Sequence, residues 1–497
     1  MLPVTLLLLG ALALRLVLWN RAVGFEQGDP LEYVNIAYKL AFGIGIEWWD
    51  LRPLLLPILY VPVLYLAQLW PDPSGEAMVR ALRLVSVAFG VGTVGVTYLL
   101  GRRLGGEVVG LGAALLVAVN PVVNRLSVST FAELPSTFFV LLCLWLLLRA
   151  SAGGRPAAGA GLALGVGCMI RYQAIFYLPP VGLWVAAMAL VWGLRTRLRA
   201  SLSPTSLPGR LLLGFGAGLL LATVAQGLIE LLAYGRPFHS LLASFAYNVS
   251  SGLAPVEFGE EPFGWFFLTA PSWLGLLTVV LVLRGLTVLV RGTNVAGWRL
   301  VGLAGLTMLL ALSALPHKEE RFMAQVVPLL ALLAAQGALS MVRLPGAPGR
   351  EHGLGRGSTS LVPASTLLLL LAAAPMLVAS WRLDLQSNVG YVLGVKRAAE
   401  LRPGSTLGTI PWLVARPYAG TRLTLERMDR NVWNRRDEVA RTIEQSDFLL
   451  FPEYWLLEDH EIDKLVSAGF RSIEAYEDGV VLYQSRRLEE PGRRRSR

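Results

Sequence analysis

The sequence predicts a polytopic α-helical membrane protein that carries a small α/β domain at its C-terminal end. Of its 497 residues, 54% are hydrophobic and 16% are charged, and the mean hydropathy is +0.56. Runs of Leu, Val, Ala and Gly recur along the chain, many of them near the roughly 20 residues that a membrane-spanning helix needs. A soluble core cannot bury so much apolar surface, so these runs are interpreted as membrane spans.

About eleven runs are interpreted as spans, which together form a transmembrane domain over residues 1–382. They are residues 2–19, 81–101, 107–122, 131–149, 157–170, 174–192, 211–233, 264–283, 299–315, 322–342 and 360–381. The first run lacks a basic n-region and a clear cleavage site, so it is expected to be retained rather than removed as a signal peptide. Segment 52–70 is also apolar, but its prolines disfavour a regular helix, and it is interpreted as a re-entrant or interfacial piece.

The distribution of arginine orients these spans. If the N-terminus is cytoplasmic, the short Arg-rich loops, such as 195–210 and 343–356, all lie on the inner face, as the positive-inside rule requires. Counting 52–70 as a span would reverse this placement for every later loop. The external loops are rich in aromatic residues and carboxylates, so the chemistry is predicted on that face, in loops 25–53, 120–135, 234–265 and 317–322.

Neither the net charge nor the two cysteines indicate a nucleic-acid, disulfide or metal site. The formal net charge of +10 is interpreted as basic residues flanking membrane spans, so no nucleic-acid partner is expected. Cys143 and Cys168 lie inside apolar runs and are predicted to be packing residues. No spacing resembles a structural zinc site or a nucleotide-binding glycine loop. No cofactor is therefore predicted, and dependence on a divalent metal is left open.

The chain changes character after the last predicted span. Short alternating runs, "STLGTI", "DFLLF" and "VVLYQ", are separated by the polar, helix-periodic stretch "RRDEVARTIEQ" and other polar segments. Residues 383–490 are therefore predicted to form a soluble α/β domain on the external face. The basic tail 491–497 is interpreted as a solvated end.

Two acids stand close together in the first external loop. In "GDPLEYVNIAYKL", Asp29 and Glu32 are three residues apart, and Pro30 predicts that Asp29 caps a short helix whose next turn carries Glu32. The pair fits a catalytic site and an ordinary capped interfacial helix equally well. Further on, "GIGIEWWDLRP" contains Trp48 and Arg52. Tryptophans at such a boundary are typical of an interfacial belt, and a platform for sugar or lipid is the alternative.

Ionisable residues also occur at the ends of predicted spans. Glu133 lies at the outer end of a predicted span, near the end of the second external loop, and Arg171 follows the fifth span in "GCMIRYQAIF". Charges near membrane depth are costly, so they are usually paired or functional. Function is favoured for Arg171, whereas for Glu133 the two interpretations weigh equally.

The segment "HKEERF" concentrates five ionisable residues between two apolar runs. His317, Lys318 and Arg321 form a cationic cluster beside two carboxylates. Such a cluster suits an anionic phosphate at the membrane surface, because Arg binds with a planar fork and Lys as a point charge. The alternative is an interfacial turn with snorkelling side chains, which would normally be looser and wholly basic.

"HKEERF" resembles the signature of the C-type glycosyltransferases, the family that includes the lipid-phosphate-mannose-dependent mannosyltransferases of N-glycan and glycosylphosphatidylinositol-anchor assembly. "GDPLEYVNIAYKLAFGIGIEWWDLRP" is similar to the first external loop of that family, "STFAELPS" to its second-loop segment, and "LAYGRPFHSLLASFAYNVSSG" to its "YG…F…N" segment. These motifs occur in the family's order over about residues 1–330. The family's acidic pair is adjacent, whereas here Pro30 follows Asp29 and the second acid is Glu32.

The resemblance implies inverting transfer of a sugar, mannose above all, from a polyprenyl-phosphate donor to an external lipid-linked glycan or another acceptor hydroxyl. It implies catalytic roles for Asp29 and Glu32. Contact with the donor phosphate is assigned to His317, Lys318, Arg321 and Arg52, and substrate binding to Glu320, Glu133, Arg171, Tyr234, Asn248 and Trp48. The compact, Arg-rich chain predicts a multi-pass protein of a prokaryotic cell membrane, with membrane lipids around it and an undecaprenyl-type donor.

Two other kinds of function are weighed against this one. A transferase of the same type using another polyprenyl-phosphate sugar, such as glucose, arabinose or aminoarabinose, is the nearest alternative. A transporter or flippase would be expected to show inverted repeats with broken helices in corresponding halves, and the sequence shows no such symmetry. A receptor-like module would leave Arg171 and "HKEERF" without a role.

Overall fold

The computed structural model of the protein describes residues 2–24, 28–44, 51–69, 74–150, 156–195, 207–251, 253–291, 296–342, 361–409, 412–419, 422–427, 436–452, 466–467 and 469–488. The chain divides into two compact units. The first comprises Met1–Leu18, Trp49–Leu56 and Ser86–Leu383. The second comprises Trp19–Trp48, Pro57–Val85 and Asp384–Arg497.

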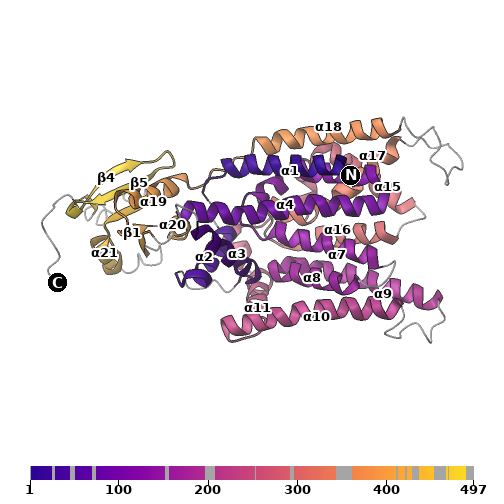
Figure 1. Ribbon diagram of the computed structural model, residues 1–497, viewed down its shortest axis with the longest axis horizontal. Helices are drawn as coiled ribbons and strands as arrows, with labels where there is room; N and C mark the ends of the chain where they lie inside the picture. The colour runs from indigo at the N-terminus through magenta and orange to yellow at the C-terminus, as the bar shows by residue number, and fades with distance from the viewer. Residues whose placement is uncertain are drawn as a thin grey trace. The chain divides into compact units, whose positions relative to one another are not determined.

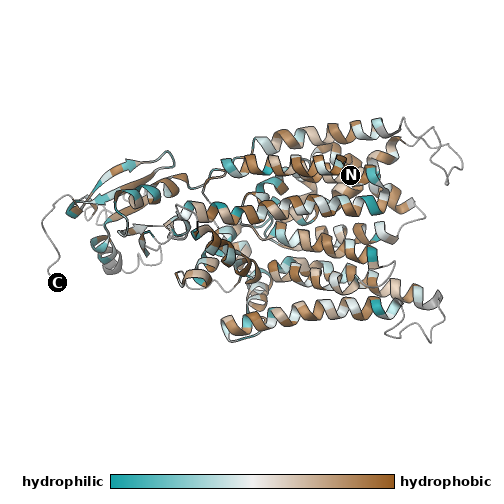
Figure 2. Ribbon diagram, viewed as in Figure 1, coloured by the Kyte–Doolittle hydropathy of each residue, from teal (hydrophilic) through white to brown (hydrophobic). Residues whose placement is uncertain are grey.

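The first unit is built mainly from apolar helices, which appear brown in Figure 2. Within the described residues, seven helices are long and apolar enough to cross a membrane. Four of them are the whole helices α1 (Leu2–Arg21), α4 (Gly75–Gly105), α7 (Glu133–Ala150) and α16 (Ala296–Ala314). The other three are Tyr172–Trp192, which joins η1 to α9, Pro208–Tyr234 in α10, and Pro363–Trp381 in α18. The pair α5 (Glu107–Val119) and α6 (Pro121–Ser127), bent by 63°, raises the number to eight if it counts as one span. The predicted polytopic membrane architecture is confirmed.

The remaining helices before residue 383 are either shorter apolar helices or short helices in the loops between the long ones (Figure 1). The apolar ones are α3 (Leu55–Gln68), α8 (Ala157–Ile170), α15 (Leu276–Arg291) and α17 (Val327–Val342). Four elements are longer or shorter than the spans they contribute to, and their full bounds are η1 (Tyr172–Tyr177), α9 (Leu178–Arg195), α10 (Leu207–Tyr234) and α18 (Leu361–Trp381). The loop elements are α2 (Asp29–Phe42), α11 (His239–Phe245), η2 (Ala246–Ser250), α12 (Leu253–Phe258), α13 (Trp265–Leu268), α14 (Ala270–Leu274) and η3 (Glu320–Gln325). The predicted number of about eleven spans is not confirmed, because the predicted spans 157–170, 264–283 and 322–342 fall on helices shorter than a membrane span: α8, the run α13 to α15, and η3 with α17.

The expectation for segment 52–70 was wrong in one respect, because α3 is a helix despite its prolines. Pro57 falls in the first turn, where the backbone amide would have no acceptor within the helix. Pro62 lies inside the helix and is tolerated there. The 14 residues of α3 are fewer than the roughly 20 that a span needs.

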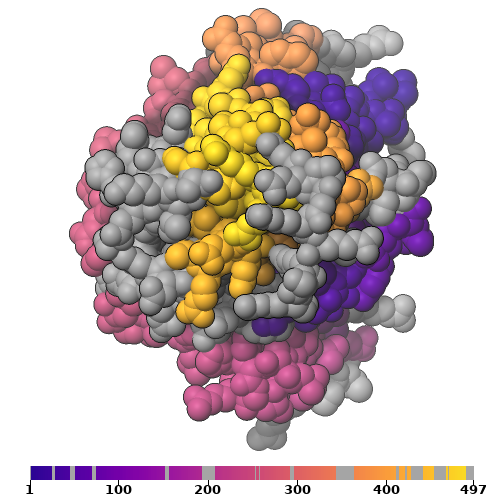
Figure 3. All heavy atoms as spheres, turned by 90° about the vertical axis from the view of Figure 1, so that its left-hand side faces the viewer, coloured from indigo at the N-terminus to yellow at the C-terminus, as the bar shows by residue number. Residues whose placement is uncertain are grey.

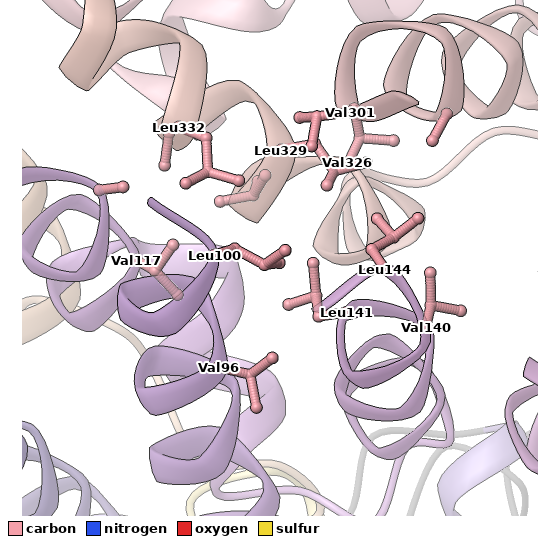
Figure 4. Packing of buried hydrophobic residues seen from close by; sticks show 14 of the residues in the cluster. Val96, Leu100, Val117, Val140, Leu141, Leu144, Val301, Val326, Leu329 and Leu332 are labelled. Carbon is pink, nitrogen blue, oxygen red and sulfur yellow. The ribbon is translucent and has the colours of Figure 1, made fainter. Parts of the chain in front are cut away.

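The buried core of the first unit joins helices that are distant in sequence. Figure 4 shows Val96 and Leu100 of α4 and Val117 of α5 near Leu141 of α7 and Leu329 of α17. Glycines allow some helices to touch by their backbones. A Cβ atom on Gly337 of α17 would lie 2.0 Å from the carbonyl oxygen of Leu281 in α15. Close approach at small residues is a typical way for helices to pack in a membrane.

We expect the substitution Gly337→Ala to destabilise the protein, because its methyl group would collide with the α15 backbone. Overpacking of this kind costs typically about 1–3 kcal/mol. Gly182→Ala in α9 is the matched control, because a Cβ there meets nothing within 4 Å. Thermal unfolding in detergent should show a lower midpoint for Gly337→Ala than for the control. Equal midpoints would contradict the close α15–α17 contact.

Among the described residues, the C-terminal region forms a five-stranded mixed sheet in the order β2-β1-β3-β5-β4. Its elements are α19 (Val389–Leu401), β1 (Thr406–Thr409), α20 (Trp412–Ala419), β2 (Thr424–Arg427), α21 (Arg436–Gln445), β3 (Phe448–Pro452), β4 (Phe470–Ala475), β5 (Val480–Ser485) and η5 (Arg486–Leu488). Strand β1 is parallel to β2 and β3, whereas β5 is antiparallel to β3 and β4. Figure 3 shows the surface of the last strands in yellow.

The predicted α/β character of this region is confirmed. "STLGTI", "DFLLF" and "VVLYQ" are β1, β3 and β5, and "RRDEVARTIEQ" contains α21. Strands β2 and β4 were not predicted. They form the two edges of the sheet, and β4 buries only Phe470, so its sequence lacks the apolar alternation of a half-buried strand.

Candidate active site

Two arginines meet one buried carboxylate in the first unit. Glu133 is the first residue of α7 and its side chain is fully buried. Nη2 of Arg171 lies 3.0 Å from Oε1 of Glu133, and Nε of Arg321 lies 3.6 Å from the same oxygen. The structure therefore brings together three residues that the sequence marked separately, and the two cations stabilise the charge of Glu133 away from water.

Arg171 is placed by the end of α8. Its backbone amide closes that helix on the carbonyl of Gly167, at 3.0 Å, and its own φ of −150° leads the chain out into η1. Its Nε donates to Oε1 of Gln173 at 2.7 Å. With Glu133 as a second partner, the guanidinium is fixed on two sides.

The "HKEERF" segment surrounds a second carboxylate. Oε1 of Glu319 accepts hydrogen bonds from Nη2 of Arg321 at 2.5 Å and from Nε2 of His317 at 2.9 Å. The Arg321 guanidinium also lies over the ring of Phe131, 4.6 Å from its centroid, and 5.4 Å from that of Phe322. Arg321 is thus held between two carboxylates and against aromatic faces, which favours a fixed orientation.

Lys318 has a different role in this segment. Its Nζ donates to the carbonyl oxygens of Glu261 at 2.6 Å, Leu315 at 2.5 Å and Pro316 at 3.3 Å. Burial holds the pKa of the Lys318 ammonium below its usual value, although the nearby carboxylates of Glu261 and Glu260 oppose this shift. These contacts join the "HKEERF" loop to the segment that precedes α13.

The other predicted residues of the first unit are dispersed. Glu320 is exposed and accepts a hydrogen bond from Oγ of Ser272 at 2.7 Å. Tyr234 ends α10 and places its ring 4.9 Å from that of His239. Asn248 is exposed in η2 and donates to the carbonyl of Ser244 at 2.8 Å. Arg52, which follows α2 and precedes α3 in the sequence, is half-buried, and Trp48, a residue of the second unit, lies outside the described residues.

Asp29 and Glu32 belong to the second unit and are both buried, with 6% and 4% of their surface exposed. The prediction that Asp29 caps α2 was wrong. Gly28 is the N-cap, with φ of 95°, and its carbonyl accepts from the amide of Leu31 at 3.0 Å. Asp29 is the first residue of the helix, where the partial positive charge of the helix terminus favours a carboxylate.

The surroundings of α2 differ from those of an interfacial helix. Every residue from Asp29 to Tyr38 is buried, so all sides of this stretch are covered. An amphipathic helix on a membrane surface would leave a polar face exposed. Both acids of the first loop are therefore enclosed within the first turn of a buried helix.

The sequence interpretation missed Glu230, the one carboxylate of the apolar helix α10. Its side chain is fully buried and accepts hydrogen bonds from Tyr172 Oη at 2.7 Å and Ser240 Oγ at 2.6 Å. Gln226 also donates to it. Because Tyr172 follows Arg171 directly, this network fixes the turn that carries Arg171. A lone carboxylate in a membrane helix was a signal that could have found it.

Arg15 was missed for a similar reason. It is fully buried in α1, where Nε donates to Oγ of Ser127 at 3.0 Å and Nη1 to the carbonyl of Ala118 at 3.3 Å. These partners lie on α5 and α6, on either side of their bend. Arg15 thus stabilises the bent pair that leads to the second loop. Among the described residues, no group of three His, Cys, Asp or Glu side chains could hold a metal ion.

The fold is similar to that of several solved membrane transferases. The structure of ArnT from Cupriavidus metallidurans bound to undecaprenyl phosphate superposes with a TM-score of 0.64 at 13% identity, and the match covers 97% of each chain. AglB, an oligosaccharyltransferase from Archaeoglobus fulgidus in complex with an inhibitory peptide and a dolichol-phosphate, matches with a TM-score of 0.56 at 14% identity. That match covers 98% of this chain and 74% of AglB.

A third similar structure is the arabinofuranosyltransferase AftD from Mycobacteria, with a TM-score of 0.55 at 14% identity, covering 97% of this chain and 40% of that one. No curated protein sequence matches this chain significantly. The resemblance of its loop motifs to the C-type glycosyltransferases is confirmed by these folds and by a family match. The sequence model of the Alg9-like mannosyltransferases matches residues 5–401, and the protein, a membrane glycosyltransferase, belongs to the Alg9-like mannosyltransferase family.

Proposed function

We propose that the protein transfers mannose, with inversion, from a polyprenyl-phosphate donor to a hydroxyl of an external lipid-linked glycan or a similar acceptor. The observation that carries the proposal is the cluster in which Arg171 and Arg321 meet Glu133 beside the "HKEERF" segment. The lipid phosphates bound by ArnT and AglB support a donor of this class.

Arg321 is the proposed ligand of the donor phosphate. Its Nη2 and the Nε2 of His317 approach a single carboxylate oxygen of Glu319, so the two groups already surround an anionic oxygen. A phosphate oxygen can accept the same charge-assisted hydrogen bonds. The side chain of Arg321 is 17% exposed and that of Glu319 is 37% exposed, so an incoming phosphate can displace Glu319 from the guanidinium. Glu133 then keeps the guanidinium in place.

Asp29 is the proposed general base, and Glu32 the residue that orients the acceptor. Inverting transfer requires removal of the acceptor proton as the new bond forms. The phosphate leaves as a stable anion and needs no strong acid. One carboxylate is therefore sufficient for the chemistry, and the first-loop motif assigns it to Asp29.

A second candidate is transfer of another sugar from the same kind of donor, because AftD is an arabinofuranosyltransferase with a similar fold. The test uses purified protein in liposomes with membrane lipid extract as the acceptor source. Polyprenyl-phosphate mannose, glucose, arabinose and aminoarabinose are offered one at a time, beside GDP-mannose. Turnover is expected with the mannose lipid. Turnover with another lipid sugar would select the second candidate, and turnover with GDP-mannose alone would refute the donor class.

We further propose a topology of eleven spans in a prokaryotic cell membrane, with residues 383–490 as an external domain. An accessible tag inserted within 195–210 should be protected from a membrane-impermeant label in sealed cells, because that Arg-rich loop is expected inside. A tag placed after residue 385 should react. The reverse labelling pattern would contradict an external active face.

A further inference from the structure

The C-terminal sheet lies beyond the part of the chain that the family match covers, since that match ends at residue 401 and β1 begins at Thr406. The same compact unit nevertheless contains this sheet, α2 and the first residues of α4. Its packing shows three separate contacts between the C-terminal region and the elements around the first loop.

The first contact joins α20 to the middle of α2. Tyr38 is fully buried, and its Oη donates to the carbonyl of Pro417 at 3.0 Å, beside Sδ of Met78 at 3.3 Å. Pro417 lies in the last turn of α20, where carbonyl groups have no donor within the helix. The Tyr38 hydroxyl therefore satisfies a carbonyl at a helix end and fixes the two helices to each other.

The second contact joins α20 to the start of α4. A Cβ atom on Gly75 would lie 2.2 Å from the carbonyl oxygen of Tyr418. The obstacle is backbone rather than a flexible side chain, so a larger residue at this position must move α20. Burial raises the pKa of the Tyr418 phenol to about 12, which agrees with the enclosed position of this helix.

The third contact holds the chain that enters the first loop. The amide of Val23 donates to the carbonyl of Leu385 at 3.0 Å, and the amide of Ser387 donates to the carbonyl of Val23 at 3.0 Å. A Cβ atom on Gly24, whose φ is 73°, would lie 1.5 Å from the carbonyl oxygen of Ser387. Arg83 of α4 donates to the carbonyl of Ala22 at 2.8 Å and to that of Gly24.

These contacts hold helix α2 in place. Helix α2 has 14 residues, and isolated helices of that length are marginal in water, so its position depends on what packs around it. We infer that the C-terminal domain positions α2, and with it Asp29 and Glu32. It does so through α20, which contacts Tyr38 of α2 and closely approaches Gly75 at the start of α4; we call this arrangement the clasp. The inference rests on the catalytic role proposed for Asp29. Tyr38 and Gly75 are positioning residues and do not touch the substrate.

Two variants of the full-length protein test the clasp. Tyr38→Phe keeps the ring and removes the hydrogen bond, so kcat should fall by about 5-fold, the scale of one such bond. Gly75→Ala moves α20, and kcat should fall by roughly 10–100-fold, because small displacements of catalytic groups are costly. Donor affinity should stay at the wild-type value in both, since Arg321 belongs to the other unit.

Two substitutions serve as matched controls. Tyr476→Phe removes a hydroxyl of the C-terminal domain that has no hydrogen-bond partner among the described residues, and Gly216→Ala places a methyl group where nothing lies within 4 Å. Both should transfer sugar at the wild-type rate. Wild-type kcat in both Tyr38→Phe and Gly75→Ala would overturn the clasp, and Tyr38→Phe keeps the test available if Gly75→Ala fails to fold.

The decisive measurement combines Gly75→Ala with Asp29→Asn. If Gly75 acts only through Asp29, the double variant should be no slower than Asp29→Asn alone. A further loss equal to that of Gly75→Ala by itself would show general structural damage and overturn the clasp while leaving the role of Asp29 intact. Should Asp29→Asn transfer sugar at the wild-type rate, the proposed base fails, and the clasp inference fails with it.

Discussion

Replacing Asp29 by Asn should lower the rate of sugar transfer by roughly 10²–10⁴-fold, the usual loss when a general base is removed. The substitution keeps the size of the side chain but removes its basicity. Helix α2 should persist, because Gly28 rather than Asp29 provides its N-cap. Loss of a favourable charge at the helix terminus costs only about 0.3–1 kcal/mol. The effect should therefore appear in kcat and leave donor affinity nearly unchanged.

Glu32→Gln is the matched control for this experiment, since Glu32 is equally buried in the same helical turn. It should reduce turnover less than Asp29→Asn if it only orients the acceptor. Initial rates with saturating donor, measured on folded protein, distinguish the cases. An active Asp29→Asn beside an inactive Glu32→Gln would exchange the two roles, and activity in both variants would remove the first loop from the chemistry.

Replacing Arg321 should have the second large effect, on donor binding. Arg321→Lys keeps the charge but loses the planar fork, and we expect the donor affinity to weaken by something like 1–3 kcal/mol, the scale of a hydrogen bond to a charged group. Arg321→Ala should weaken it further, because it removes both the positive charge and the N–H donors that now face Glu133 and Glu319. Titration of the purified protein with polyprenyl-phosphate sugar measures both losses.

An arginine outside the cluster provides the comparison for these titrations. Arg382 follows α18 and is exposed, so Arg382→Ala should bind the donor as tightly as the wild-type protein does. Unfolding temperatures should confirm that all three variants are folded. Wild-type affinity in both Arg321 variants would reduce "HKEERF" to an interfacial turn.

The sequence located the long apolar helices of the first unit, because the length of an apolar run is a local property, but it joined α13, α14 and the start of α15 into one span. It also marked Glu133, Arg171 and Arg321 individually, since charges at the ends of apolar runs are conspicuous. It could not show that both arginines meet the same carboxylate, because the three residues lie on α7, after α8 and in η3. That convergence depends on how the helices pack.

Other features could not be predicted from the sequence, again for physical reasons. Glu230 and Arg15 lie within apolar helices, and their partners are distant in the chain, so nothing local indicated what they bind. The edge strands β2 and β4 were not predicted because β2 has only four residues and β4 buries only Phe470, so neither sequence carries a clear apolar alternation. The contacts of α20 with α2 and α4 were also invisible, since Tyr38 and Pro417 are separated by most of the chain.

The anomeric configuration of the product tests the central claim most directly. In liposomes supplied with polyprenyl-phosphate mannose labelled at C1, nuclear magnetic resonance of the glycosylated acceptor reports the configuration, and the released lipid can be quantified in the same sample. A single displacement assisted by one base predicts a configuration opposite to that of the donor, with one polyprenyl phosphate released for each mannose transferred. Retention of configuration, or transfer without release of polyprenyl phosphate, would contradict the mechanism proposed for Asp29 and Arg321.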